Sequence, residues 1–157
     1  EDDDPAIRAV HGALNAQANE LLYRRVDLED AVTAHLAAMA AAPRLGFGRY
    51  IVSSSTPFTA AHLAALNRDA PALVAELFPE YRKLYMERGW TMFPRIGRVY
   101  VNALAQADLG WTPRFDFRHV LNCLGRNEDF RSPLAREVGA KGYHDTVLVE
   151  GPYPVTR

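Results

Sequence analysis

The clearest hydrophobic pattern of the chain lies in the stretch VDLEDAVTAHLAAM, residues 26–39. Apolar side chains there recur every three or four positions, as they do on one face of an α-helix. Asp27 precedes the pattern, where a carboxylate can accept a hydrogen bond from an unpaired amide of the first turn. The sequence predicts a helix that begins after Asp27, ends at Pro43 and Gly46, and buries one face. That face consists of Leu28, Ala31, Val32, His35, Leu36 and Met39.

Other segments combine apolar spacing with helix start and stop signals. Asp116 and Ser132 stand where N-caps are expected, and Gly110 and Gly125 stand where helices are expected to stop. Asp69 with Pro71 starts a helix that Pro79 interrupts. The remaining predicted helices cover residues 5–22, 59–66, 80–89, 102–110, 117–125 and 133–139.

Three short runs favour β-strands between these helices. They are RRVDL (24–28), GRYIVSSS (48–55) and GRVYV (97–101), and the tail 142–155 is expected to be extended. Helices that alternate with a few short strands predict an α/β chain that is mostly helical in residue count.

Composition limits the function classes. A chain of 157 residues suits one domain, and a net charge of −1 gives no general attraction to nucleic acid or to an anionic membrane. Cys123 is the single cysteine, which excludes an intrachain disulfide and a cysteine-rich metal site. No apolar run is long enough to span a membrane, so a cytoplasmic protein is expected. The numbering starts at EDDDP without an initiator methionine, which suggests a part of a longer protein.

Three motifs together resemble a known family. The segment VDLEDAVTAH is similar to the Val-His-Val-Asp-Asp-Val-Ala-x-Ala-His motif of extended short-chain dehydrogenases/reductases of the NAD-dependent epimerase/dehydratase type. The segment GRYIVSSSTPFTAAHLAAL resembles the strand and helix that follow in this family. The segment PRIGRVYVNALAQADLGWTP resembles its Arg-x-Gly run and its Leu-Gly-Trp-x-Pro ending. The resemblance extends over about residues 23–124.

The resemblance implies that residues 1–157 are the C-terminal, substrate-binding portion of a Rossmann-type enzyme. The chain contains no Gly-x-Gly-x-x-Gly turn and no Tyr-x-x-x-Lys pair, since Tyr81 and Lys83 have the wrong spacing. In the family both signatures lie in the N-terminal dinucleotide-binding half, so no catalytic residue is assigned here. NAD or NADP would be bound mainly by that missing half, and the chain alone would be inactive. The expected partners are a nucleotide-sugar or a similar small molecule and the N-terminal half, without nucleic acid or membrane. Whether the complete enzyme forms a homodimer stays open.

Arg95 is the first candidate for substrate binding. It matches the family arginine that reaches the diphosphate of a nucleotide-sugar, and a planar guanidinium can hold two phosphate oxygens at once. Arg98 stands where the family commonly has an aspartate. Arg24 and Arg25 are the first residues of the first predicted strand, where the family places basic and aromatic groups on the nucleotide side. Asn102 lies near a usual aspartate. Solvated surface roles are the alternative for these arginines.

The remaining polar residues favour structural roles. Asp27, Glu29 and Asp30 are expected to cap a helix, His35 to bond to a backbone carbonyl in the core, and His62 to cap or to lie on the surface. No spacing of His11, His119 and His144 supports a metal site. Ser53, Ser54 and Ser55 lack a general base, so a serine nucleophile is not expected.

Two alternatives to the enzyme fragment stay open. One is a stand-alone helical interaction or DNA-binding module, although the segment 56–77 has few basic residues to meet phosphates. The other is a degenerate, non-catalytic paralogue.

A fragment has a further structural consequence, because helices that pack on the missing half leave apolar surface exposed to solvent. An exposed apolar patch is therefore expected around the 28–39 helix and residues 50–52.

Overall fold

The computed structural model describes residues 10–139, and every regular element in this range is helical. The elements are α2 (Ala13–Glu20), α3 (Leu28–Leu45), the short 3₁₀ turn η1 (Ala60–His62), α4 (Leu63–Leu77), α5 (Tyr81–Met86), α6 (Ala103–Leu109), α7 (Phe117–Gly125) and α8 (Pro133–Val138). None of these helices has both the length and the apolar content needed to cross a bilayer. The predicted extended tail, residues 142–155, lies outside the described range.

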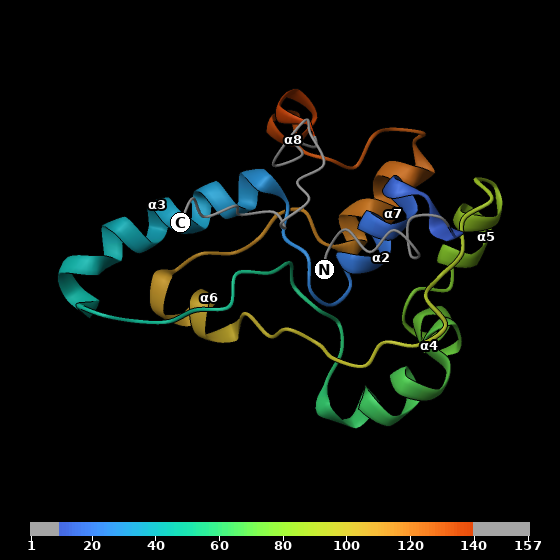
Figure 1. Ribbon diagram of the computed structural model, residues 1–157, viewed down its shortest axis with the longest axis horizontal. Coiled ribbons are helices and arrows are strands. Elements are labelled where there is room, and N and C mark those ends of the chain that lie inside the picture. The colour runs from blue at the N-terminus through green and yellow to red at the C-terminus, as the bar shows by residue number, and fades with distance from the viewer. Residues whose placement is uncertain (1–9, 140–157) are drawn as a thin grey trace, which may run out of the picture.

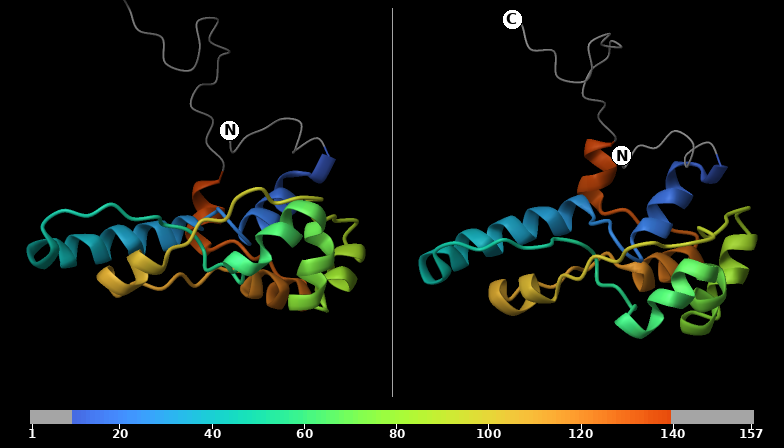
Figure 2. Two further views of the ribbon diagram at one scale, coloured as in Figure 1. Left: turned by 90° about the horizontal axis from the view of Figure 1, so that it is seen from below. Right: turned by 60° about the horizontal axis from the view of Figure 1, so that its bottom comes forward.

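The helices form two groups of unequal size (Figure 1). Helix α7 packs against α2 and α5, and α4 packs against α5, so these four share one side of the molecule. Helix α3 projects away from them and packs against α6 and α8. Figure 2 shows α3 and α6 together at one end and the α4–α5 region at the other. Long extended segments connect the two ends.

Each group has its own hydrophobic core. The larger core includes Leu22, Leu66, Val74, Phe117 and Val120, all of which are buried. The smaller core consists of three buried residues from α3, α6 and the loop after α6: Ala34, Ala105 and Trp111. The alanines let the backbones of α3 and α6 approach closely, and the Trp111 ring covers the contact.

The prediction of an α/β fold is wrong for the described residues. The runs 24–28, 48–55 and 97–101 are not strands, and residues 10–139 contain no sheet, so a Rossmann-type fold is not shown. These runs do lie beside one another, but they meet at isolated points. Ser54 N–H donates to Arg25 O (2.8 Å), and Tyr100 N–H donates to Tyr23 O (2.7 Å). A strand needs a ladder of successive hydrogen bonds. Here a single backbone bond joins run 24–28 to run 48–55, and a single one joins run 97–101 to Tyr23, directly before run 24–28.

The capping signals, by contrast, are confirmed. The Asp27 carboxylate accepts a hydrogen bond from Glu29 N–H, and Asp116 accepts one from His119 N–H (both 2.9 Å). The Ser132 hydroxyl accepts a hydrogen bond from Ala135 N–H (3.0 Å). At Asp69 the backbone leaves helical geometry, and its carboxylate caps the second half of α4 through Ala72 N–H (3.0 Å).

The predicted end of α3 is only partly right. The helix runs through Pro43, which falls in its last turn, and ends at Gly46, whose positive φ of 70° suits glycine. A proline this near the end removes one hydrogen bond without breaking the remaining turn.

The predicted buried face of α3 is wrong as well. Leu36 and Met39 are 58% and 71% exposed, and Leu28, Val32 and His35 are exposed too, whereas Asp30, Ala34 and Ala41 face inward. The His35 ring still contacts its expected carbonyl, Ala31 O, at 2.7 Å. The exposed apolar patch is confirmed along α3 and at Ile51, while Tyr50 and Val52 pack partly against the smaller core.

Candidate functional site

A polar pocket lies where the chain leaves α2 and where it passes from α5 to α6. Its volume is about 380 Å³, which is within the usual size range of small-molecule sites. The Tyr100–Tyr23 backbone bond fastens the two segments together at the pocket. The lining residues are Tyr23, Arg24, Arg95, Ile96, Gly97, Arg98 and Tyr100. We call this the arginine pocket.

The arginine pocket is strongly cationic. Three guanidinium groups line it, from Arg24, Arg95 and Arg98, and none of its described lining residues is acidic. Arg95 and Arg98 are exposed, and within residues 10–139 neither makes an ion pair with a carboxylate. An uncompensated pair of guanidinium groups beside two phenol rings is suited to bind an anion.

Arg24 is held in place by the buried carboxylate of Glu20. Glu20 is the last residue of α2 and is 2% exposed. Its carboxylate accepts a hydrogen bond from Arg24 Nη2 (2.6 Å) and another from Arg25 Nη1. The Glu20 carbonyl also accepts bonds from the amides of residues 23–25 (2.9–3.0 Å), which produces a tight turn. After this turn, Arg24 lines the arginine pocket and Arg25 lines a second pocket, while both also line a small polar pocket beside Glu20 and Val26.

The segment that carries Arg95 is anchored on both sides. Asn15 Oδ1 accepts a hydrogen bond from Thr91 N–H (3.0 Å), and Asn19 Nδ2 donates to Thr91 O (2.9 Å). Closer to the pocket, Ile96 N–H donates to Leu66 O (3.0 Å), and the Ile96 side chain is buried in the larger core. The backbone next to Arg95 is therefore fixed while its side chain faces solvent.

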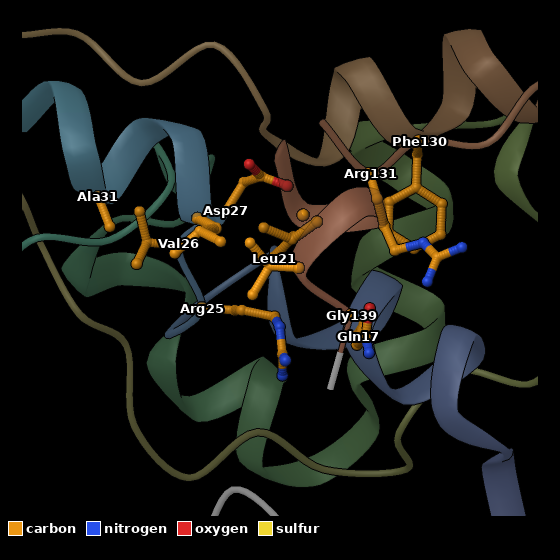
Figure 3. A pocket seen from close by; sticks show the side chains of 12 residues that line it. Gln17, Leu21, Arg25, Val26, Asp27, Ala31, Phe130, Arg131 and Gly139 are labelled. Atoms are coloured by element: carbon orange, nitrogen blue, oxygen red, sulfur yellow. The ribbon is translucent and has the colours of Figure 1, made fainter. Parts of the chain in front are cut away.

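Arg25 enters a second pocket, between α2, the start of α3 and α8 (Figure 3). Its volume is about 430 Å³, and Leu21, Val26 and Phe130 supply part of an apolar wall. The charged groups in it already have partners. Arg131 pairs with Asp129 (2.6 Å), and this hydrogen bond is the main reason that the pKa of Asp129 lies below its usual value. Asp27 accepts hydrogen bonds from Glu29 N–H and Ser132 N–H (3.1 Å).

The structure thus brings together two of the four predicted substrate-binding residues, Arg24 and Arg95. Arg25 lies in the second pocket. Asn102 lines neither pocket: it is 4% exposed, its Nδ2 donates to Ser53 O (2.7 Å), and its Oδ1 accepts from Gln106 Nε2 (2.7 Å). The sequence reasoning did not assign Tyr23 and Tyr100 to the site. The available signal for Tyr23 was its place directly before two arginines in YRR.

The acidic cluster at the start of α3 has structural partners. Beyond the Asp27 cap, the buried Asp30 carboxylate accepts hydrogen bonds from Arg114 N–H and Phe115 N–H (2.9 Å to Oδ2), and Glu29 pairs with the Arg114 side chain. Burial raises the pKa of Asp30, and the two amide bonds oppose this rise. Asp30 therefore ties α3 to a loop far along the chain rather than performing acid–base chemistry.

Among residues 10–139, the histidines and Cys123 show no catalytic arrangement. His62 Nδ1 accepts a hydrogen bond from Thr59 N–H (3.2 Å), which confirms a capping role. His119 Nε2 lies 3.4 Å from Cys123 Sγ and 3.0 Å from Phe130 O. Burial raises the pKa of the Cys123 thiol, which keeps it protonated and a weak nucleophile. Within residues 10–139 no group of three His, Cys, Asp or Glu side chains could hold a metal ion.

No protein-family model matches the chain, and neither curated proteins nor solved structures gave a match.

Proposed function

We propose that this chain is the substrate-binding part of an NAD(P)-dependent nucleotide-sugar epimerase/dehydratase and that its arginine pocket binds the substrate diphosphate. The observation that supports this most directly is that Arg24 and Arg95, which are far apart in sequence, line one cationic pocket. Arg95 is also the residue that the family resemblance assigns to the diphosphate.

The pocket residues would bind and orient the substrate. The Arg95 guanidinium would donate two hydrogen bonds to phosphoryl oxygens in the pocket that Arg24, braced by Glu20, also lines. Fixing the diphosphate fixes the position of the sugar, which is the contribution that a binding residue makes to a reaction elsewhere on the substrate.

The described residues do not fit the dinucleotide itself. A dinucleotide cradle needs glycines where the backbone closely approaches the pyrophosphate. In the arginine pocket a Cβ added to Gly97 would meet nothing within 4 Å, so no such close approach is built there. NAD or NADP would supply hydride transfer when bound. Residues outside this chain would bind it, and the Tyr-x-x-x-Lys pair that transfers the proton would also lie outside this chain.

Calorimetric titration of the chain with UDP-glucose tests the proposal. We expect saturable binding that Arg95→Gln weakens about tenfold or more, because a charge-assisted hydrogen bond is worth about 1.5–3 kcal/mol. Arg82→Gln on α5 is the matched control, since Arg82 is exposed and lies outside the arginine pocket. Equal losses in both variants, or tight binding of NAD by the chain alone, would contradict the proposal.

A further inference from the structure

Arg98 is the lining residue of the arginine pocket that the family resemblance does not explain. It stands where that family commonly has an aspartate, so the substitution changes the local charge by two units. Arg98 and Arg95 lie on either side of Ile96, which is buried in the larger core. Two residues after Arg98, the Tyr100 amide is bonded to Tyr23 O. The backbone of this turn is therefore anchored at both ends, with two guanidinium groups on it.

The charge balance of the pocket leaves these two groups without a counterion. The charge of Arg24 is met by the buried Glu20 carboxylate. Arg95 and Arg98 have no carboxylate partner within residues 10–139, and no acidic residue is among the described lining of the pocket. Among the described residues, Arg95 and Arg98 therefore carry two positive charges on separate side chains without a carboxylate partner. A diphosphate diester presents two negative charges on separate phosphoryl groups.

We propose that Arg98 is a second phosphate-binding residue, which holds one phosphoryl group of the diphosphate while Arg95 holds the other. This inference rests on the proposed function and deepens it, because it makes the pocket selective for a diphosphate over a monophosphate of the same charge. A guanidinium can be bidentate to one phosphoryl group, so two guanidinium groups match two phosphoryl groups.

UDP-glucose and UMP separate this inference from a general electrostatic effect. Above the second phosphate pKa of about 6, both ligands carry two negative charges, but only UDP-glucose has two phosphoryl groups. The chain and its Arg98→Gln, Arg95→Gln and Arg82→Gln variants would be titrated with each ligand by calorimetry at constant ionic strength. Circular dichroism and thermal unfolding would verify that each variant is folded.

We expect Arg98→Gln to weaken UDP-glucose binding about tenfold, or about 1.4 kcal/mol, and UMP binding less than about twofold. Arg98→Asp, which restores the residue typical of the family, should weaken UDP-glucose binding further, and Arg82→Gln should change neither affinity. Equal weakening of both ligands by Arg98→Gln would overturn the inference, because Arg98 would then act only through its field. If Arg95→Gln loses UDP-glucose binding while Arg98→Gln binds as tightly as the unmodified chain, the inference is overturned and the proposed function stays intact. Unchanged binding in both variants, or no binding to the unmodified chain, would overturn both.

Discussion

Glu20 illustrates how one side chain can organise two sites. Its carboxylate is almost fully buried, and a buried charge is tolerated only where it is well paired. Both partners, Arg24 and Arg25, are partly exposed; Arg24 lines the arginine pocket, and Arg25 lines the second pocket. Glu20 is thus a positioning residue for Arg24.

Replacing Glu20 by glutamine should affect both stability and binding. The amide keeps the shape but loses the charge, so we expect the free energy of unfolding to fall by about 2 kcal/mol, since breaking a buried pair is costly. The affinity for UDP-glucose should fall severalfold because Arg24 loses its brace. Urea denaturation and calorimetry measure these changes, with the exposed Glu76→Gln as control. Unchanged affinity would show that the arginine pocket does not depend on Glu20.

Asp30 should give the chain a specific pH dependence. Burial raises its folded pKa above 3.8, so between 3.8 and that raised pKa the folded state holds more protons than the unfolded state. The stability contributed by Asp30 is therefore fully present below pH 3.8 and is lost as pH rises through the folded pKa. Urea denaturation of the unmodified chain and Asp30→Asn at several pH values measures this. The free energy of unfolding of the unmodified chain should fall relative to that of the variant as pH increases. If it rises relative to the variant instead, the prediction is contradicted.

At the scale of elements, local signals predicted the helices well and the extended segments poorly. A cap such as Asp27 or Asp116 bonds within three residues, so its partner is visible in the sequence. A strand depends on a partner segment far along the chain, and the run 48–55 found only one backbone bond to such a segment. Periodicity located α3 but could not say which of its apolar sides faces the core.

The candidate site shows the same contrast between local signals and contacts of distant segments. Residue type and resemblance predicted Arg24 and Arg95 as site residues. Their proximity depends on the Tyr23–Tyr100 backbone bond, which no local pattern encodes. Asn102 was assigned to substrate binding because it lies near a usual aspartate of the family that the sequence resembles. The structure instead directs its side chain to Ser53 O and Gln106, which a sequence cannot reveal.

The two sides of α3 should respond very differently to substitution. Ala34 is 2% exposed and packs in the smaller core with Ala105 and Trp111, so Ala34→Leu should lower the free energy of unfolding by about 1–3 kcal/mol through overpacking. Leu36 is exposed, so Leu36→Gln should change stability by less than about 0.5 kcal/mol. Urea denaturation of both variants makes the comparison. A larger loss for Leu36→Gln would contradict the burial of α3 described here.

At the scale of the molecule, the two cores differ greatly in size. Among residues 10–139 the larger core has 19 buried members and the smaller has three. Each core has one tryptophan, with Trp90 packed against the larger and Trp111 inside the smaller. Regions with few buried apolar contacts open at lower free energy than the main core.

The smaller core should therefore open first. Native-state hydrogen exchange should show lower protection for amides of α6 than for amides of α7. Fluorescence gives an independent measurement: Trp90→Phe leaves Trp111 as reporter, and Trp111→Phe leaves Trp90. We expect the Trp111 signal to change at lower urea concentration than the Trp90 signal. Coincident transitions together with equal protection would show that the chain unfolds as one cooperative unit.

The position of Cys123 has a practical consequence. Its sulfur is enclosed in the larger core beside His119, and burial keeps the thiol protonated. Maleimide reagents, which are attacked by thiolates at the surface, should leave the folded chain unmodified. A cysteine introduced on the rim of the arginine pocket would then carry a fluorescent or spin label alone, without removal of the native residue.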